Sequence, residues 1–342
     1  MKKLTALITA GIMAVVVLVG CGGGESEVSS AAASSAKSET EGTSSAKEDG
    51  EKYKVGFSMD FTTNVWRAVM LEKMEKAAEE HSDEIELIVT NANEDSNKQI
   101  SDVEDLMSQD IDLLIISPYL TEPLTPIIEE VYDKGIPVVV IDHDISSVSD
   151  KYTTFIGASN TQIGEKAGEK IVELLNGNGN VVELSGTPGL QATIDRGDVM
   201  HSVADKYEGI KFLANINCEY DQAKAMSNME DLLQSLEPSE IDLIYTYNDA
   251  MALGAVQAIE DAGYSDAGVQ ILSIDAQKKT MEYIKEGKMI YGTFTYPWPS
   301  EKAIEVALDI LHGNDVEKYY ELESVLITAE NVDEYYDPNS DY

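Results

Sequence analysis

The stretch Ile111-Asp-Leu-Leu-Ile-Ile116 is an almost wholly apolar run, and a second such run follows at Pro137-Val-Val-Val-Ile141. Short apolar runs of this kind are typical of strands in a parallel sheet that is covered on both faces. The segment between them has helical character and ends at Gly135, a residue type that commonly terminates helices. Since neighbouring parallel strands are joined by a crossover, this stretch predicts a strand–helix–strand unit.

The same alternation of strands and helices extends outward from this unit. On the N-terminal side, helices are predicted at 64–81 and 96–109, the second with Ser96 as its N-cap. After Thr161 the alternation begins again. The further predicted strands are Tyr53–Ser58, Ile85–Thr90, Lys151–Gly157, Asn180–Leu184, Ile210–Ile216, Ile241–Tyr245 and Val269–Ile274. Two such runs predict an α/β fold with two doubly wound parallel sheets, in which ligands bind beyond the carboxyl ends of the strands.

Length and charge limit the classes of partner. The 342 residues suffice for two α/β domains of ordinary size. There are 24 Lys and Arg residues against 63 Asp and Glu residues, which gives a formal net charge of -39. A surface this acidic repels nucleic acid and anionic membranes, so neither is expected as a partner.

The N-terminal residues predict the compartment. Lys2 and Lys3 precede an uncharged, mostly apolar run that ends in Leu18-Val-Gly-Cys21. This segment resembles the signal peptide and lipobox of bacterial lipoproteins, which implies removal of residues 1–20 and acylation of Cys21. The alternatives are a single membrane-spanning anchor or an ordinary secretory signal. The run is shorter than the roughly 20 residues that span a bilayer, and no basic cluster follows it.

Residues 21–52 are rich in Gly, Ser, Ala, Glu and Lys and nearly lack large apolar residues, so we expect a flexible tether after the lipid anchor. The protein is then expected outside the cytoplasmic membrane, on its outer face in a Gram-positive cell or on the periplasmic side in a Gram-negative one. With Cys21 acylated, Cys218 has no disulfide partner and is expected to be a small buried residue.

Sequence motifs of common enzymes do not occur. Gly177-Asn-Gly-Asn180 lacks the third glycine of a dinucleotide fingerprint and precedes a predicted strand instead of following one. There is no G-x-x-x-x-G-K-[ST], H-E-x-x-H or G-x-S-x-G, and the four histidines have no metal-ligand spacing. We therefore expect no catalytic residues, no cofactor and no metal.

Several segments, taken in order, resemble the ribose/galactose-type periplasmic sugar-binding proteins, a type I periplasmic binding protein-like family. The resemblance runs from about residue 53 to 330, and its most specific motif is Asn248-Asp-Ala-Met-Ala-Leu-Gly254. The other segments are Tyr53-Lys-Val-Gly-Phe-Ser58, Asn64-Val-Trp-Arg67, Ile136-Pro-Val-Val-Val-Ile-Asp142, Gly186-Thr-Pro-Gly189, Asp195-Arg-Gly197 and Ile271-Leu-Ser-Ile-Asp275.

The resemblance implies two lobes joined by a three-segment hinge, with a sugar in the cleft and closure of the lobes around it. The N-terminal lobe is expected to comprise 53–157 plus 293–323, and the C-terminal lobe 158–292 plus 324–342. The crossing segments are expected near Ile156–Ser159, Gly292–Tyr296 and Leu322–Ile327. The expected partner is the permease of an ABC importer, and the protein is expected to be a monomer.

The resemblance also implies ligand contacts in the N-terminal lobe, at Asn64, Trp66, Arg67 and Asp142. Trp66 is expected to stack on the sugar and Arg67 to bind its oxygens; the alternatives are a core tryptophan and a solvated arginine. Asp142 is expected to accept bonds from two hydroxyls, unless it serves as a helix or turn cap. Relatives commonly carry arginine at the next position, where this chain has His143, so a ligand contact by His143 is left open.

In the C-terminal lobe, Arg196 and Tyr220 are the first implied contacts. Arg196 is expected to bond hydroxyls through its planar fork, unless it pairs with Asp195 or Asp198. Tyr220 is expected to be a second stacking ring that faces Trp66 across the cleft.

Asn248 and Asp275 end predicted strands and are expected to bond further hydroxyls, whereas Asp249 is expected to cap the next helix. Tyr296 stands where relatives usually carry Gln or Asn, and would narrow the pocket. Trp298 is expected either to close the rim or to pack under the hinge.

The ligand class that these groups imply is a neutral monosaccharide or a related polyol, with a sugar acid or a non-sugar solute left open. A DNA-binding regulator shares the fold but needs a DNA-binding headpiece before it. In that position this chain has an apolar leader and an acidic tether, so this alternative fails. The remaining alternatives are a receptor subunit for a membrane sensor kinase or chemoreceptor, and an enzyme on the same fold.

Overall fold

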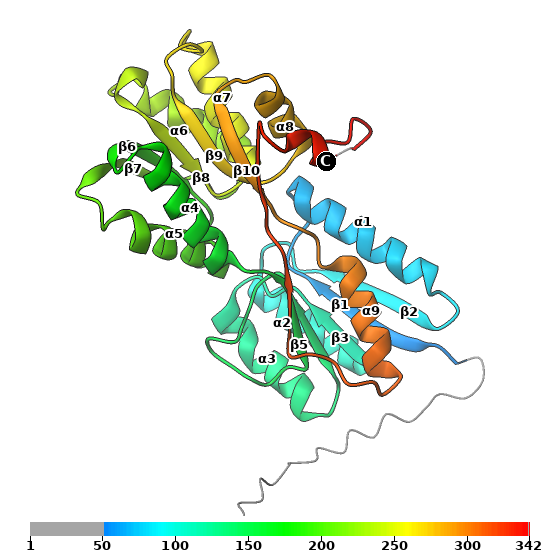
Figure 1. Cartoon of the computed structure of the whole chain (residues 1–342). Helices are drawn as coiled ribbons and strands as arrows, with labels where there is room; N and C mark the ends of the chain where they lie inside the picture. Colours follow the sequence, from blue (N-terminus) through cyan, green and yellow to red (C-terminus); the bar gives the residue numbers. More distant parts are fainter. Residues whose placement is uncertain (1–50, 341) are drawn as a thin grey trace, which may run out of the picture. The chain divides into compact units, whose positions relative to one another are not determined.

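Two six-stranded sheets, A and B, organise the computed structural model (Figure 1). It describes residues 51–340 and 342, all within one compact unit of the chain. The predicted signal peptide, Cys21 and nearly all of the predicted tether lie outside the described residues. None of the helices in the described part of the chain is long and apolar enough to cross a membrane.

Sheet A is parallel throughout, in the order β11-β5-β4-β3-β1-β2. Helices α1 and α9 cover one face, and α2 and α3 cover the other (Figure 1). The strands are β1 (Tyr53–Met59), β2 (Ile85–Asn91), β3 (Leu113–Ile116), β4 (Val138–Ile141), β5 (Thr154–Ala158) and β11 (Tyr319–Leu322), and the helices are α1 (Val65–Glu80), α2 (Ser96–Ser108), α3 (Thr121–Asp133) and α9 (Ser300–Leu311).

The apolar run at β3 shows why this sheet needs helices on both faces. Leu113 and Ile115 pack in one core with α1 and α9, and Leu114 and Ile116 pack in the other with α2 and α3. All four side chains are fully buried. Each contributes about 1.5–3 kcal/mol relative to an exposed position, so burial on both faces accounts for the unbroken run.

Sheet B has the order β12-β10-β9-β8-β6-β7, and only β12 runs antiparallel to its neighbour. Helix α4 packs beside α5, and α6 beside α7. The strands are β6 (Asn178–Ser185), β7 (Gly209–Asn217), β8 (Leu243–Thr246), β9 (Gln270–Asp275), β10 (Ile290–Thr295) and β12 (Leu326–Thr328), and the helices are α4 (Asn160–Leu174), α5 (Gln191–Ala204), α6 (Gln222–Leu232), η1 (Pro238–Glu240), α7 (Asp249–Asp261), α8 (Lys278–Lys285) and α10 (Val332–Tyr335).

The chain passes between the two sheets after β5, after β10 and after β11. The predicted fold class of two doubly wound α/β lobes is confirmed. The lobe limits expected from the resemblance, and the closure of the lobes, stay predictions. In each sheet the strand order reverses beside the first strand, between β1 and β3 in sheet A and between β6 and β8 in sheet B. Ligands of open α/β sheets bind at such points.

Two predicted helix caps are wrong. The N-cap of α2 is Asp95, whose carboxylate accepts from the backbone N–H groups of Asn97 and Lys98, so Ser96 is already helical. The N-cap of α7 is Asn248, whose side-chain oxygen accepts from Met251 N. Asp249 is turned inward to the interior of sheet B instead. Cys218 is buried and free, as expected.

Candidate ligand-binding cavity

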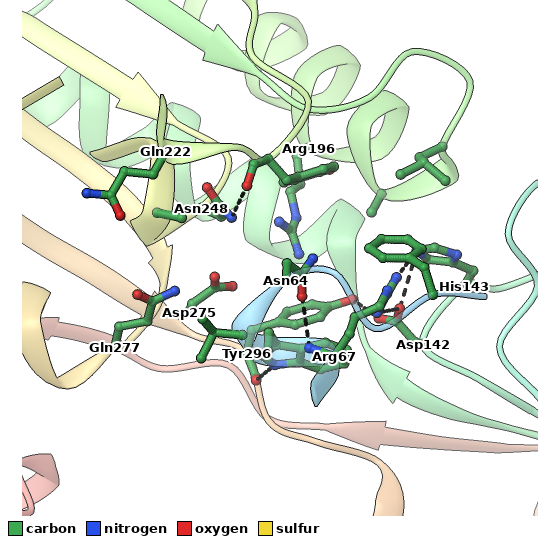
Figure 2. A pocket seen from close by; sticks show the side chains of 17 residues that line it. Asn64, Arg67, Asp142, His143, Arg196, Gln222, Asn248, Asp275, Gln277 and Tyr296 are labelled. Carbon is green, nitrogen blue, oxygen red and sulfur yellow. Dashed lines mark hydrogen bonds and ion pairs between the residues drawn. The ribbon is translucent and has the colours of Figure 1, made fainter. Parts of the chain in front are cut away.

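A cavity of about 100 Å³ lies at the carboxyl ends of strands from both sheets, and all ten predicted ligand contacts line it (Figure 2). These residues follow β1, β4, β7, β8 and β10, end β9, or lie in the first turn of α1 or the second turn of α5. The ten are Asn64, Trp66, Arg67, Asp142, His143, Arg196, Tyr220, Asn248, Asp275 and Tyr296. The structure thus brings the whole predicted set together, while contact with a ligand stays a prediction for each.

Three lining residues have a backbone that non-glycine residues rarely adopt. The φ angle is 63° at Asp142, 60° at Tyr220 and 125° at Asp275. Such conformations cost free energy and persist only where the surroundings hold them, so they concentrate at ligand clamps and active sites. Asp142 directly follows β4, Tyr220 lies three residues after the end of β7, and Asp275 is the last residue of β9, so each lies at or beyond the carboxyl end of a strand and lines the cavity.

Arg67 binds two buried carboxylates at one end of the cavity, and Figure 2 shows one of them, Asp142. Its Nη2 lies 2.8 Å from Asp60 Oδ2, and its Nη1 lies 2.8 Å from Asp142 Oδ2. Burial raises the pKa of Asp142, but the ion pair with Arg67, the neighbouring His143 and the hydrogen bond from Tyr296 together outweigh this effect, and the pKa is lowered to about 2. The alternative of a solvated Arg67 is therefore wrong, because the residue is buried and tied into an ion-pair cluster.

His143 completes this cluster. Its Nδ1 lies 2.7 Å from Pro118 O, and its Nε2 lies 3.1 Å from Arg67 Nη2. A carbonyl only accepts, so Nδ1 carries the hydrogen, and Nε2 of the neutral ring can accept from Arg67. Asp60, Asp142 and His143 also offer ligand atoms within 4.8 Å of one another, the pattern of a metal site. However, the guanidinium of Arg67 already binds all three and supplies the positive charge there.

Tyr296 links this cluster to Arg196. The Tyr296 hydroxyl donates to Asp142 Oδ1 at 2.6 Å and accepts from Asn160 Nδ2 at 3.2 Å. Arg196 Nε donates to Asn160 Oδ1 at 2.8 Å, and its Nη1 donates to Tyr247 O at 2.5 Å. The alternative that Arg196 pairs with Asp195 or Asp198 is wrong, because its guanidinium donates to these two neutral oxygens.

The aromatic side chains beside the cavity also pack against one another in the core. Trp66 is 6% exposed, its Nε1 donates to Tyr296 O at 2.9 Å, and its ring stacks on Trp298 at 6.4 Å. Trp66 therefore both borders the cavity and belongs to the core. Trp298 packs against Trp66, and its predicted position, at the rim or under the hinge, stays a prediction. Tyr220 is fixed by its hydroxyl, which lies 2.9 Å from Thr193 Oγ1.

Two asparagines cap helices with their side-chain oxygens and keep amide hydrogens available at the cavity. Asn64 Oδ1 accepts from Arg67 N at 2.8 Å and caps α1. Asn248 caps α7, and its Nδ2 donates to Tyr220 O at 3.3 Å. Capping fixes each side-chain oxygen, so hydrogens of each amide group remain for a ligand in the cavity.

Asp275 is the acidic group at the other end of the cavity. Burial first, and then the neighbouring Asp249, raise the pKa of Asp275 well above its usual range. Burial also raises the pKa of Asp249 to about 7, although its carboxylate accepts from Ser273 Oγ, from Thr293 Oγ1 at 2.8 Å and from Gln277 N at 2.6 Å. A carboxyl that keeps its proton can donate a hydrogen bond to a ligand oxygen.

The matching family model describes a periplasmic binding protein domain and spans residues 55–315. The chain belongs to the periplasmic binding protein family. It is 32% identical over 269 residues to the ribose import binding protein RbsB of Bacillus subtilis, covering 78% of this chain and 85% of that protein. It is 30% identical over 251 residues to a xylitol-binding protein of Mycolicibacterium smegmatis, covering 73% and 70%. The resemblance inferred from the sequence is confirmed.

Solved structures of periplasmic binding proteins agree with this fold. A solute-binding protein of an ABC transporter from Bacillus halodurans, with bound myo-inositol, matches with a TM-score of 0.78 at 30% identity, over 84% of this chain and 99% of that one. The fructose-binding periplasmic domain of a hybrid two-component system matches with a TM-score of 0.75 at 31% identity, over 83% and 93%.

Sequence reasoning missed several groups of this periplasmic binding protein's cavity. Gln222 and Gln277 line it, two residues after Tyr220 and Asp275, so their place behind strand ends was a usable signal. Asp60 and Asn160 bind Arg67 and Arg196, and nothing local in the sequence indicates these pairings. The remaining lining residues are Phe61, Val65, Leu190, Ala192 and Ala250.

Proposed function

We propose that this protein binds a neutral monosaccharide or a related polyol in the cavity and delivers it to the permease of an ABC importer. The observation that carries the proposal is the set of polar side chains that converge from both sheets beside Trp66 and Tyr220. Relatives are named for the import of ribose and the binding of xylitol, and one structural neighbour holds myo-inositol.

The chemistry of the cavity matches a polyol. Gln222 and Gln277 supply amides that both donate and accept, and Asn64 and Asn248 supply amide hydrogens. Arg196 supplies the guanidinium N–H groups that Asn160 and Tyr247 leave unused, and Asp275 supplies a carboxyl. The volume of about 100 Å³ is several times the roughly 10–15 Å³ that a cavity needs to hold one water. It suits a ligand with a few hydroxyl groups better than an oligosaccharide.

The charges favour a neutral ligand over a sugar acid. Arg67 is neutralised by Asp60 and Asp142 and adds no free positive charge. Arg196 faces the same cavity as Asp275. A ligand carboxylate would therefore meet one unpaired guanidinium, already hydrogen-bonded to Asn160 and Tyr247, beside the Asp275 carboxyl, and its desolvation would be poorly offset.

The family name supports a place outside the cytoplasm. We further propose that Cys21 is acylated and that residues 21–52 tether the binding domain to the membrane. Metabolic labelling with a radioactive fatty acid tests this directly: label on the wild-type chain that is lost in Cys21→Ser is expected, and an unlabelled wild-type chain contradicts the anchor.

A receptor role is the second candidate, because one structural neighbour is the sugar-binding domain of a two-component system. Co-purification with a permease supports import, whereas co-purification with a sensor kinase supports signalling. We propose no catalytic activity, and turnover of any bound sugar by the purified protein would contradict this.

A thermal-shift screen of the mature chain, residues 21–342, tests the proposed ligand class. The panel contains pentoses, hexoses, polyols, sugar acids and amino acids. A ligand that binds only the folded state adds about 2.7 kcal/mol of stability at a hundredfold excess over its Kd. We expect one neutral sugar or polyol to raise the Tm of the wild type but not of Arg196→Ala. A shift with amino acids alone would overturn the sugar assignment.

A further inference from the structure

The tail of the chain returns to the start of α8, next to the cavity. The backbone carbonyl of Tyr342 accepts from Lys278 N at 3.0 Å. The Lys278 side chain donates to Pro338 O at 2.6 Å and to Ser340 O at 3.1 Å. Lys278 directly follows the cavity residue Gln277, so these three bonds hold the tail immediately behind the cavity wall.

The ring of Tyr342 extends an aromatic column that ends in the cavity. Tyr342 is 8% exposed, and its ring meets Trp298 edge-on, with centroids 4.8 Å apart at 74°. Trp298 stacks on Trp66, and Trp298 Nε1 donates to Trp66 O at 3.0 Å. Trp66 in turn contacts the Tyr296 ring at 5.1 Å. A shift of the Tyr342 ring is therefore transmitted by packing to two rings that line the cavity.

The hydroxyl of Tyr342 is buried and has no hydrogen-bond partner of good geometry among the described residues. It lies close to two polar residues that line the cavity, Asp275 and Gln277. Burial raises the pKa of this hydroxyl most, the Asp275 carboxyl raises it further, and the Gln277 amide lowers it. Figure 2 shows Asp275 and Gln277 together, at the end of the cavity away from Asp142 and His143.

A second cavity, of about 280 Å³, is lined by Tyr342 together with Val65 and Gln277. Val65 and Gln277 also line the ligand cavity, so Tyr342 lies on the other side of the wall that they form. Buried hydroxyls in folded proteins are nearly always bonded, so an unbonded one beside two ligand-facing groups points to a state in which they meet.

We propose that Tyr342 is a positioning residue of the ligand cavity, whose hydroxyl holds Asp275 and Gln277 for the ligand while its ring supports Trp66 through Trp298. The inference rests on the proposed function. It adds a tail residue, outside the matched family segment, to the groups that determine affinity.

Calorimetric titration with D-ribose, xylitol and myo-inositol tests this on the mature chain and its Tyr342→Phe variant. For the probe that binds the wild type most tightly, we expect Tyr342→Phe to raise the Kd at least fivefold without lowering the Tm of the ligand-free protein. A role in folding alone would lower the Tm and leave the Kd unchanged. Tyr335→Phe, a change in an exposed tail tyrosine, is expected to bind as the wild type does.

Tryptophan emission gives a second readout, because the two tryptophans of the chain are Trp66 and Trp298. We expect the probe to change this emission in the wild type and in Tyr335→Phe, and to change it less in Tyr342→Phe at saturation. Equal Kd values and equal emission changes in wild type and Tyr342→Phe would overturn the inference alone. A wild type that binds none of the three probes would contradict the proposed function, and the inference with it.

Discussion

Arg67 shows how a single residue changes the charge that the cavity offers to a ligand. Two carboxylates, Asp60 and Asp142, are removed from solvent within one small region, and Arg67 is paired with both. The pKa of Asp142 is lowered to about 2, whereas burial keeps the pKa of Asp60 raised in spite of Arg67. Breaking a buried ion pair by deleting one partner leaves an uncompensated charge, which costs much more than the pair contributes. The arrangement keeps Asp142 ionised and oriented at the cavity wall.

Arg67→Met is therefore expected to lower the free energy of unfolding by about 3–5 kcal/mol in urea denaturation. Adding Asp60→Asn is expected to restore part of this loss, because it removes one of the stranded carboxylates. Lys73→Met serves as the control, since Lys73 forms an exposed pair with Glu301 worth at most about 1 kcal/mol. A loss in Arg67→Met no larger than in Lys73→Met would contradict the account of the cluster.

Gly186 matters because the Tyr220 ring lies where a side chain would be. A Cβ at Gly186 would stand 2.1 Å from Tyr220 Cζ and 2.5 Å from its hydroxyl oxygen. Gly186→Ala is expected to displace the ring and raise the ligand Kd at least tenfold, about 1.4 kcal/mol, in calorimetric titration. Thr187→Ala, the neighbouring change, is expected to bind normally. An unchanged Kd in Gly186→Ala would show that the ring position does not matter.

For single residues, the sequence predicted which side chains lie at the cavity better than it predicted which side chains bind one another. Asn248 and Asp275 could be placed because parallel strands end at a common edge. The partners of Arg67 and Arg196 could not, since Asp60 and Asn160 meet them only after the chain has folded. Nor could Tyr342, because its contacts with Trp298 and Lys278 join segments that no local pattern connects.

Among the elements, α5 is tied to sheet B by a buried acid. Glu183 on β6 accepts from the Tyr247 hydroxyl, from Asn215 Nδ2 at 2.7 Å on β7, and lies 3.0 Å from His201 Nε2 on α5. The hydrogen bond to Glu183 raises the pKa of His201 to about 9. Because Tyr247 also accepts the bond from Arg196 through its carbonyl, this network supports the position of the arginine at the cavity.

The raised pKa predicts a pH dependence with a definite sign. The folded-state value of about 9 exceeds the ordinary value of 6.5, so the stabilisation is complete below about pH 6.5 and is lost as the pH rises through 9. We expect unfolding in urea to cost about 1–2 kcal/mol less at about pH 9.5 than at about pH 6, after allowance for the partial exposure of the ring.

His201→Gln keeps a donor for Glu183 but cannot titrate, so its stability is expected to vary less over this range. His312→Gln changes an exposed histidine paired with Glu84, and it is expected to retain the wild-type dependence. If His201→Gln kept the full dependence, another group would have to be its source.

Helices and strands could be predicted from the sequence where the spacing of apolar residues matches the side chains that are buried. The strands at β1, β3 and β4 and the helices between them could be predicted from apolar runs and helical spacing. Strands β11 and β12 have four and three residues and, unlike β3 and β4, are not fully buried apolar runs, so neither period nor burial marks them. The caps of α2 and α7 were misplaced by one residue because Asp95 and Asn248 compete with equally good capping residues beside them.

For the molecule as a whole, one chain of hydrogen bonds joins the carboxyl edges of the two sheets. It runs from Asp142 after β4 through Tyr296 and Asn160 to Arg196 on α5. Tyr296 and Asn160 lie on or beside segments that pass between the sheets, so a ligand that binds Asp142 or Arg196 also acts on those segments. Closure of the lobes around a sugar is expected to work through this chain.

Calorimetric titration of two cavity-filling variants, with the sugar or polyol found by the screen, tests the central claim most directly. Ala250 lines the proposed ligand cavity, and Ala329 lines a different cavity beside β9 and β10. We predict that the wild type and Ala329→Trp bind one ligand per chain with similar Kd values, while Ala250→Trp, although folded, does not bind. Unchanged binding by Ala250→Trp, or loss of binding in Ala329→Trp alone, would place the ligand elsewhere and contradict the account.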